Sequence, residues 1–206
     1  MSEPNKIKAS AGFDAIAQAL ESLVSKKSNE QSVEYASKSL RVSINSYISF
    51  LNEPNLKNAT EMSIASNLAG KAINISKTTA PHALSYGFTT KFGIPHGHAV
   101  WLTLPKIFKM HATAHREQVS DARGSKHLQE IMQKLMKSLD IEVAKQADTI
   151  LENFIISLGV PHKLTMIGAE TVEQRAFLAK QANMERMSNN PVSFTDRDIT
   201  EIFSLD

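Results

Sequence analysis

Apolar residues recur every three or four positions along nearly the whole of this chain, and no segment alternates apolar with polar side chains. A spacing of three and four places side chains on one face of a helix, whereas alternation would indicate a strand. The 206 residues are enough to bury a core. The sequence therefore predicts an all-α fold, a bundle of eight or nine helices, with residues 1–8 as a polar tail and residues 9–206 as one helical domain.

Capping residues and helix breakers set the expected helix boundaries. Ser10 is the expected N-cap of the first helix, and Gly159 followed by Pro161 closes a helix that ends near residue 158. A largely apolar helix is expected from about residue 98 to residue 110, bent near Pro105. Pairs that resemble capping boxes predict three further helix starts, at Asn58 with Glu61, Thr171 with Gln174, and Thr195 with Asp198.

Charge and cysteine content exclude several classes of protein. Lys and Arg total 23 against 21 Asp and Glu, without a long basic run, which argues against a nucleic-acid partner. The chain has no cysteine, so it forms no disulfide and offers no thiolate ligand, and this suits a reducing cytoplasm. No apolar stretch approaches the roughly 18 residues that a membrane span needs. The first residues lack the apolar core of a signal peptide, and we expect a cytoplasmic protein.

Three of the seven histidines lie within residues 81–98. His82 follows a proline suited to the first turn of a helix, and His96 lies in a Pro-His-Gly triplet where the chain turns. Both side chains can face one point. With one carboxylate they would form a two-histidine, one-carboxylate site of the kind that binds Fe²⁺ or Zn²⁺. On spacing alone, two histidines that hydrogen-bond helix ends remain the alternative.

The glycines give no sign of a nucleotide site. None of the eight takes part in a GxGxxG pattern or a P-loop, and no GxSxG elbow is present. The chain therefore shows no dinucleotide-binding motif of its own.

Several segments together resemble the iron-containing (group III) alcohol dehydrogenases over about residues 9–206. They are Ala9–Ala15, Ala69–Gly70, Pro81–Ser85, Gly93–Gly97, Leu158–Pro161 and Asn190–Ile202. The resemblance implies the all-helical, metal-binding domain of that family, a fold similar to that of dehydroquinate synthase. It also implies that Asp14, His82 and His96 bind the metal, because they occupy the positions of the family's aspartate and of its two spaced histidines.

Two site positions depart from the family pattern. Gln18 stands where the family usually has a histidine four residues after the aspartate, so Gln18 is expected as a weak ligand or as a holder of metal-bound water. Tyr86 replaces a common histidine four residues after His82, and its phenol is expected to donate a hydrogen bond to the substrate oxygen. A tyrosine that only packs is the alternative for this position.

A third departure concerns the whole chain. The N-terminal nucleotide-binding domain of the family has no counterpart in the sequence, although the family holds its dinucleotide between the two domains. NAD(P) is therefore expected only together with such a domain, and the 206 residues are expected to be a truncated or excised domain that is inactive alone.

Lys77, Thr78 and Thr79 precede the first motif histidine and would suit an anionic substrate. The amino-acid sequence of residues 79–85 is similar to that of the family branch that reduces phosphonoacetaldehyde. A solvated lysine at a helix end is the alternative. His98 is two positions from His96 and would point elsewhere on a helix. The remaining histidines have no partner in the sequence and are expected at the surface: His111, His115, His127 and His162.

These observations leave three functions open. The first is the metal-binding catalytic domain of an NAD(P)-dependent alcohol or aldehyde oxidoreductase, which acts on a small substrate and forms a homodimer. The second keeps the metal site but performs non-redox chemistry, as in dehydroquinate synthase. The third is a helical interaction module without catalysis.

Overall fold

The computed structural model describes residues 5–205, and within them the all-α prediction is confirmed. This part of the chain contains no strand, only an isolated bridge between Val119 and Val192. Its α-helices are α1 (Asn5–Val24), α2 (Glu30–Asn52), α3 (Leu56–Ser76), α4 (Ala80–Phe92), α5 (His96–Trp101), α6 (Leu104–Ala112), α7 (Gly124–Ser138), α8 (Ala147–Ser157), α9 (Val172–Lys180), α10 (Met184–Ser188) and α11 (Asp196–Ile202). Short 3₁₀ turns occupy Arg116–Gln118, Ala144–Gln146 and Thr165–Ile167.

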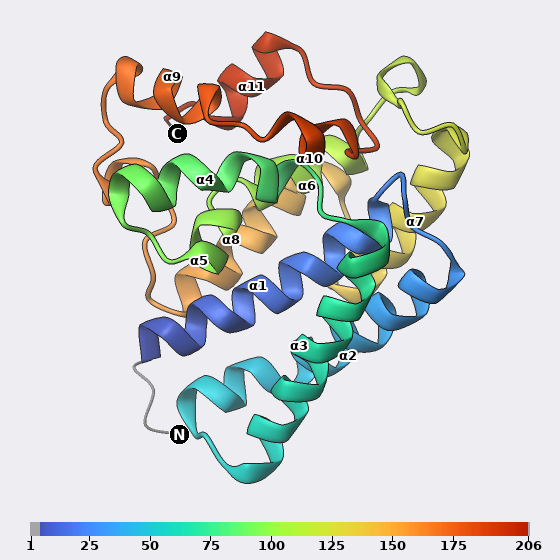
Figure 1. The fold of residues 1–206 in the computed structure, drawn as a ribbon, viewed down its shortest axis with the longest axis vertical. Helices are drawn as coiled ribbons and strands as arrows, with labels where there is room; N and C mark the ends of the chain where they lie inside the picture. The colour runs from blue at the N-terminus through green and yellow to red at the C-terminus, as the bar shows by residue number, and fades with distance from the viewer. Residues whose placement is uncertain (1–4, 206) are drawn as a thin grey trace.

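Helix α1 lies at the centre of the bundle (Figure 1) and packs against α2, α3, α5 and α7. Its apolar residues are almost fully buried, namely Phe13, Ile16, Ala17, Leu20, Leu23 and Val24. Removing that much apolar surface from water is the main force that holds the helix in place. Residues on the rest of α1 are therefore fixed against the neighbouring helices, and these include the residues expected to bind metal.

Helices α4 and α5 form a second layer. They lie between α1 and the C-terminal helices α9 and α10 (Figure 1), with α5 against α1 and α4 against α9 and α10. Apolar residues of α4 such as Leu84 and Phe88 are fully buried in a core cluster that also includes Leu178 and Phe203. The histidine-bearing segment is thus enclosed from both sides.

Two expected N-caps were wrong. Helix α1 begins at Asn5, so Ser10 lies inside it, and residues 5–8 of the expected tail are helical, whereas residues 1–4 lie outside the described part. Helix α3 is capped by Asn55, whose Oδ1 accepts from the Asn58 N–H at 3.1 Å. Glu61 instead accepts a hydrogen bond from the Ser46 hydroxyl on α2 at 2.7 Å. This partly buried carboxylate therefore joins α3 to α2 and does not cap α3.

The helix expected over residues 98–110 is two helices, α5 and α6, which are separated at Leu102 and Thr103. Pro105 lies in the first turn of α6, where its missing N–H would have had no partner inside the helix. The capping boxes at Thr171 and Thr195 are confirmed. The sequence reading missed α10, a short helix capped by the side chain of Asn183.

Candidate metal centre

Three helices bring one carboxylate and two imidazoles together. Asp14 comes from α1, His82 from the first turn of α4, and His96 is the first residue of α5. One candidate ligand atom from each residue lies within 4.8 Å of the other two. The structure thus brings together all three residues that the resemblance assigned to the metal.

The approach of α5 to α1 depends on Gly97, the residue after His96. A Cβ atom at this position would lie 1.9 Å from the Ser10 carbonyl oxygen and 2.9 Å from the Asp14 Cβ. Only glycine lets the two backbones come this close. The glycine of the Pro-His-Gly triplet therefore sets how near the His96 ring comes to Asp14.

The two carboxylate oxygens of Asp14 face different partners. Oδ1 lies 3.1 Å from His82 Nε2 and 3.9 Å from His96 Nε2. Oδ2 accepts a hydrogen bond from the Gln18 side-chain amide at 2.8 Å. In this arrangement Gln18 holds the carboxylate, and Oδ1 is the oxygen that faces both imidazoles.

Glu21 completes the site, and the sequence analysis missed it. Its side chain is buried and contacts His82 Nδ1 through Oε2. The other oxygen, Oε1, accepts from the N–H and hydroxyl of Thr79 at 2.9 and 3.0 Å. Asp14 and Glu21 are seven residues apart and so share one face of α1, a spacing that was visible in the sequence.

The charges of the site shift three pKa values. Burial alone would lower the pKa of His82, but the Glu21 and Asp14 carboxylates outweigh it and raise the pKa to about 9. Burial would raise the pKa of Glu21, yet the charge and hydrogen bonds of His82, with those of Thr79, hold it below its usual value. Burial and the positive charge of His82 lower the pKa of His96 and favour its neutral form.

The donor set fits a divalent cation. Both ring nitrogens of His82 face a carboxylate, Nδ1 that of Glu21 and Nε2 that of Asp14. If the ring is neutral and its proton is on Nδ1, the lone pair of Nε2 faces the lone pairs of the Asp14 oxygen. Such a contact is favourable only with a proton or a metal ion between the two atoms. Metal-ligating histidines commonly donate their second N–H to a carboxylate, and Glu21 is the carboxylate at Nδ1 of His82.

The site is closed on one side and open on the other. The His82 side chain is 2% exposed, whereas those of Asp14 and His96 are 28% and 45% exposed. A small molecule can therefore reach the cluster from the side of His96.

The remaining predicted site residues lie around the start of α4. Tyr86 is half-buried, one turn after His82, and the Arg186 guanidinium lies 5.6 Å from the centre of its ring. Lys77 is exposed, and its ammonium donates to the Asn74 carbonyl at 2.9 Å. The hydroxyl of Thr78 accepts from Arg186 at 2.6 Å.

The other histidines differ in burial. His98 is buried, with its ring against the Pro161 carbonyl and away from the cluster. The expectation of a surface position was wrong for His111, which is 5% exposed and lies 3.0 Å from the Asn190 side-chain oxygen. Of the other three, only His115 is exposed, and His127 and His162 are partly buried.

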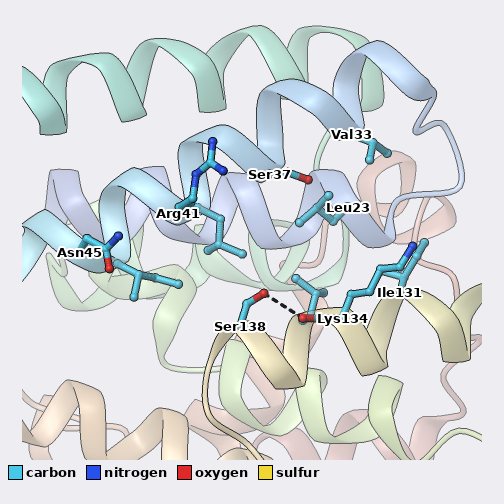
Figure 2. A pocket seen from close by; sticks show the side chains of 11 residues that line it. Leu23, Val33, Ser37, Arg41, Asn45, Ile131, Lys134 and Ser138 are labelled. Atoms are coloured by element: carbon cyan, nitrogen blue, oxygen red, sulfur yellow. Dashed lines mark hydrogen bonds between the residues drawn. The ribbon is translucent and has the colours of Figure 1, made fainter.

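A separate cavity of about 430 Å³ opens between α2 and α7, where side chains of the two helices face one another (Figure 2). Its apolar lining is Leu23, Val33, Leu40, Ile44, Ile131 and Leu135. None of the expected ligands lines it, and the chemistry of the site does not depend on it.

The described part of the chain is an all-α domain, and its cluster of one carboxylate and two histidines at a partly open site has the donor set of a mononuclear metal centre. The sequence model of the "Fe-containing alcohol dehydrogenase family, C-terminal" matches residues 8–205. The chain belongs to this family.

Known relatives and solved structures agree with this assignment. The chain is 26% identical to a phosphonoacetaldehyde reductase of Streptomyces viridochromogenes, over 87% of the chain and 44% of the relative. It is similar to a sulfoacetaldehyde reductase of Bifidobacterium kashiwanohense, solved with NAD⁺, at a TM-score of 0.79, 27% identity and coverage of 98% and 50%. An iron-containing alcohol dehydrogenase of Thermotoga maritima gives a TM-score of 0.79, 25% identity and coverage of 98% and 49%. The chain spans about half the length of these proteins.

Of the described helices, none is long and apolar enough to cross a membrane.

Proposed function

We propose that this chain is the metal-binding part of an NAD(P)-dependent alcohol or aldehyde oxidoreductase, and that Asp14, His82 and His96 hold a divalent ion, Fe²⁺ or Zn²⁺. The observation that carries the proposal is the convergence of these three side chains to within 4.8 Å of one another. Membership of the Fe-containing alcohol dehydrogenase family supports the redox reaction over the dehydroquinate synthase-like alternative.

A divalent ion at this position would supply a Lewis acid for the oxygen of an alcohol or aldehyde. The chain's own residues prepare the position. Glu21 accepts a hydrogen bond from the Nδ1–H of His82 and thereby directs Nε2 toward Asp14. Gln18 holds Oδ2 of the aspartate and leaves Oδ1 facing the two imidazoles. We assign to Tyr86 the donation of a phenolic hydrogen bond to the substrate oxygen.

The complete reaction belongs to the whole protein. In the reductive direction, a hydride passes from NAD(P)H to the carbonyl carbon and a proton passes to the oxygen, which gives the alcohol. The similarity to a phosphonoacetaldehyde reductase and to a sulfoacetaldehyde reductase supports a small anionic aldehyde as the substrate. A homodimer in a reducing cytoplasm, without nucleic acid or membrane partners, completes the proposal.

Metal analysis tests the ligand set. We expect the 206-residue chain, purified without chelator and dialysed against Zn²⁺, to retain about one ion per chain. His82→Ala and His96→Ala should each lose most of it, because each removes one of three ligands. Circular dichroism of the same samples checks that the variants are folded.

His115→Ala is the matched control, because His115 is exposed and lies outside the cluster. Its metal content should equal that of the unmodified chain. Equal metal content in all four proteins would contradict the proposed ligand set, and so would loss of metal from the control alone.

A further inference from the structure

A small cavity lies where the end of α3, the loop after α1 and the helix α10 meet. Its volume is about 180 Å³. A water molecule takes up about 30 Å³ of the liquid, so the cavity has room for a tetrahedral oxyanion. The polar residues that line it are Lys27, Lys77, Thr78, Glu185, Arg186 and Asn189. Three of these are cations and one is an acid, which gives the lining a net charge of +2.

The positive charges of this cavity are not neutralised by ion pairs. In the part of the chain that the structure describes, no carboxylate forms an ion pair with Lys27, Lys77 or Arg186, although other cations of the chain have such partners. Lys77 uses one N–H on the Asn74 carbonyl, which leaves two further donors on its ammonium. A cavity with uncompensated positive charge attracts anions.

The position of Arg186 is fixed by the backbone. Asn183, which caps α10, donates its N–H to the Ala83 carbonyl of α4 at 2.9 Å and accepts from the Arg186 N–H at 3.0 Å. The guanidinium then lies between the Thr78 hydroxyl and the ring of Tyr86. Most of its five N–H donors remain for a ligand, and the planar group suits a carboxylate or phosphonate.

Lys77 is held in an unusual backbone conformation, with φ 59° and ψ 172°. Glycine adopts this conformation readily, whereas a residue with a side chain is strained in it. Strain of this kind occurs at ligand-binding sites, where the position of the side chain matters more than local stability. A lysine at this position is consistent with a use for its ammonium at the cavity.

The cavity is linked to the candidate metal ligands through a short series of contacts. Thr78 lines it, and the next residue, Thr79, binds Glu21, which in turn holds His82.

We propose that the cavity beside Arg186 is an oxyanion subsite. It holds the phosphonate, sulfonate or carboxylate end of the substrate, while the carbonyl oxygen of the substrate lies at the ion held by Asp14, His82 and His96. The substrate role rests on the proposed function, but binding of an oxyanion to the cavity can be measured without it. Arg186 is the main contact, and Lys77 and Lys27 add charge. The sequence analysis had placed the anion with Lys77 and the two threonines, of which Thr79 binds Glu21 instead.

Calorimetric titration of the metal-free 206-residue chain with phosphonoacetate and with inorganic phosphate tests the subsite. Arg186→Met should weaken the binding of both anions about tenfold to hundredfold, since charge-assisted hydrogen bonds are lost. Lys27→Met, at an exposed position, should weaken the binding severalfold and gives a second test if Arg186→Met is unfolded. Arg197→Met, on the exposed side of α11, is the control and should bind as the unmodified chain does.

Unchanged affinity in Arg186→Met and Lys27→Met, or an equal loss in the Arg197→Met control, would overturn the subsite. Because these titrations use the metal-free chain, they are independent of whether Asp14, His82 and His96 bind metal. With Zn²⁺ bound, phosphonoacetate should bind at least tenfold more tightly than phosphate, since one molecule then reaches both the cavity and the metal. Equal affinities would assign the cavity to free phosphate and overturn the substrate role.

Discussion

The buried side chain of Glu21 determines the orientation and the pKa of His82, although Glu21 is not itself one of the three candidate ligands. It holds the Nδ1 side of His82 and the backbone and hydroxyl of Thr79, so the start of α4 is tied to α1 at the imidazole itself. A carboxylate buried on an otherwise apolar face is costly unless it is paired and hydrogen-bonded. Here the pairing that lowers this cost also orients the imidazole of His82.

Glu21→Gln is expected to lower the affinity for Zn²⁺ about tenfold to hundredfold, the usual effect of losing the partner of a ligating histidine. The amide keeps the size of the side chain but removes the charge that favours the correct orientation of His82. Competition with a chromophoric chelator measures the affinity. Glu34→Gln, on the exposed side of α2, should leave it unchanged. An affinity within twofold of that of the unmodified chain would contradict the role given to Glu21.

At this scale the sequence revealed the residues of a spaced motif but not those that support them. His82 and His96 follow from their spacing around a local turn, and Asp14 follows from the resemblance. Glu21 meets His82 and Thr79, and Arg186 meets Thr78, only through contacts between residues far apart in the sequence, which no local pattern encodes. The seven-residue spacing from Asp14 to Glu21 was the one available signal.

Among the elements, α5 has the strictest geometric requirement. The helix is only six residues long, and such a short helix depends on tertiary packing for its stability. Its first turn lies against α1 at Gly97, and Trp101 at its end donates its indole N–H to the Phe13 carbonyl at 2.8 Å. The position of the His96 ring is therefore a property of the contact between α5 and α1.

Gly97→Ala is expected to destabilise the chain by about 1–3 kcal/mol, the typical cost of overpacking, and to reduce metal content, because the new methyl group would overlap the Ser10 carbonyl. Gly70→Ala is the matched control. It lies inside α3 with nothing within 4 Å of the added Cβ, so it should stabilise the chain by up to about 1 kcal/mol. Urea unfolding of both variants measures the difference. A Gly97→Ala chain as stable as the unmodified one would show that α5 can move away without cost.

Side-chain caps begin the helices α3, α9, α10 and α11, and the sequence predicted two of these four starts. Thr171 and Thr195 begin helices as expected, since their hydroxyls bond the N–H three residues on. Asn55 took the place of Asn58 as a cap, although both are good capping residues, because α3 starts one turn earlier. Helix α10 has only five residues, too few for a periodic pattern to reveal.

For the whole molecule, the C-terminal segment is joined to the rest by buried polar groups as well as by apolar packing. The Asn189 side chain donates to carbonyls of Ser76 and Thr78 at 2.8 and 3.0 Å, and its neighbour Asn190 contacts His111 of α6. These bonds connect residues far apart in sequence, and their buried atoms lose solvation if any partner is removed. No local sequence pattern predicts these contacts, because they exist only in the folded bundle.

His111 should make the stability of the molecule depend on pH. Burial lowers its pKa to about 4, an effect that the hydrogen bond to Asn190 and the charge of Glu21 only partly offset. The unfolded chain, in which the histidine has its ordinary pKa near 6.5, therefore binds more protons between about pH 4 and 6.5. The stability that neutral His111 gives the folded chain is fully present above pH 6.5. About 3 kcal/mol of the free energy of unfolding is lost as the pH falls toward 4.

Urea unfolding at intervals between pH 4.5 and 7 measures this dependence. His111→Gln keeps a donor for the Asn190 oxygen but cannot be protonated in this range, so its free energy of unfolding should vary less with pH than that of the unmodified chain. His115→Gln alters an exposed histidine and should preserve the full slope. If the unmodified chain and His111→Gln lose stability in parallel as the pH falls, another group is responsible, and the neutral state of His111 is not what holds the C-terminal segment against α6.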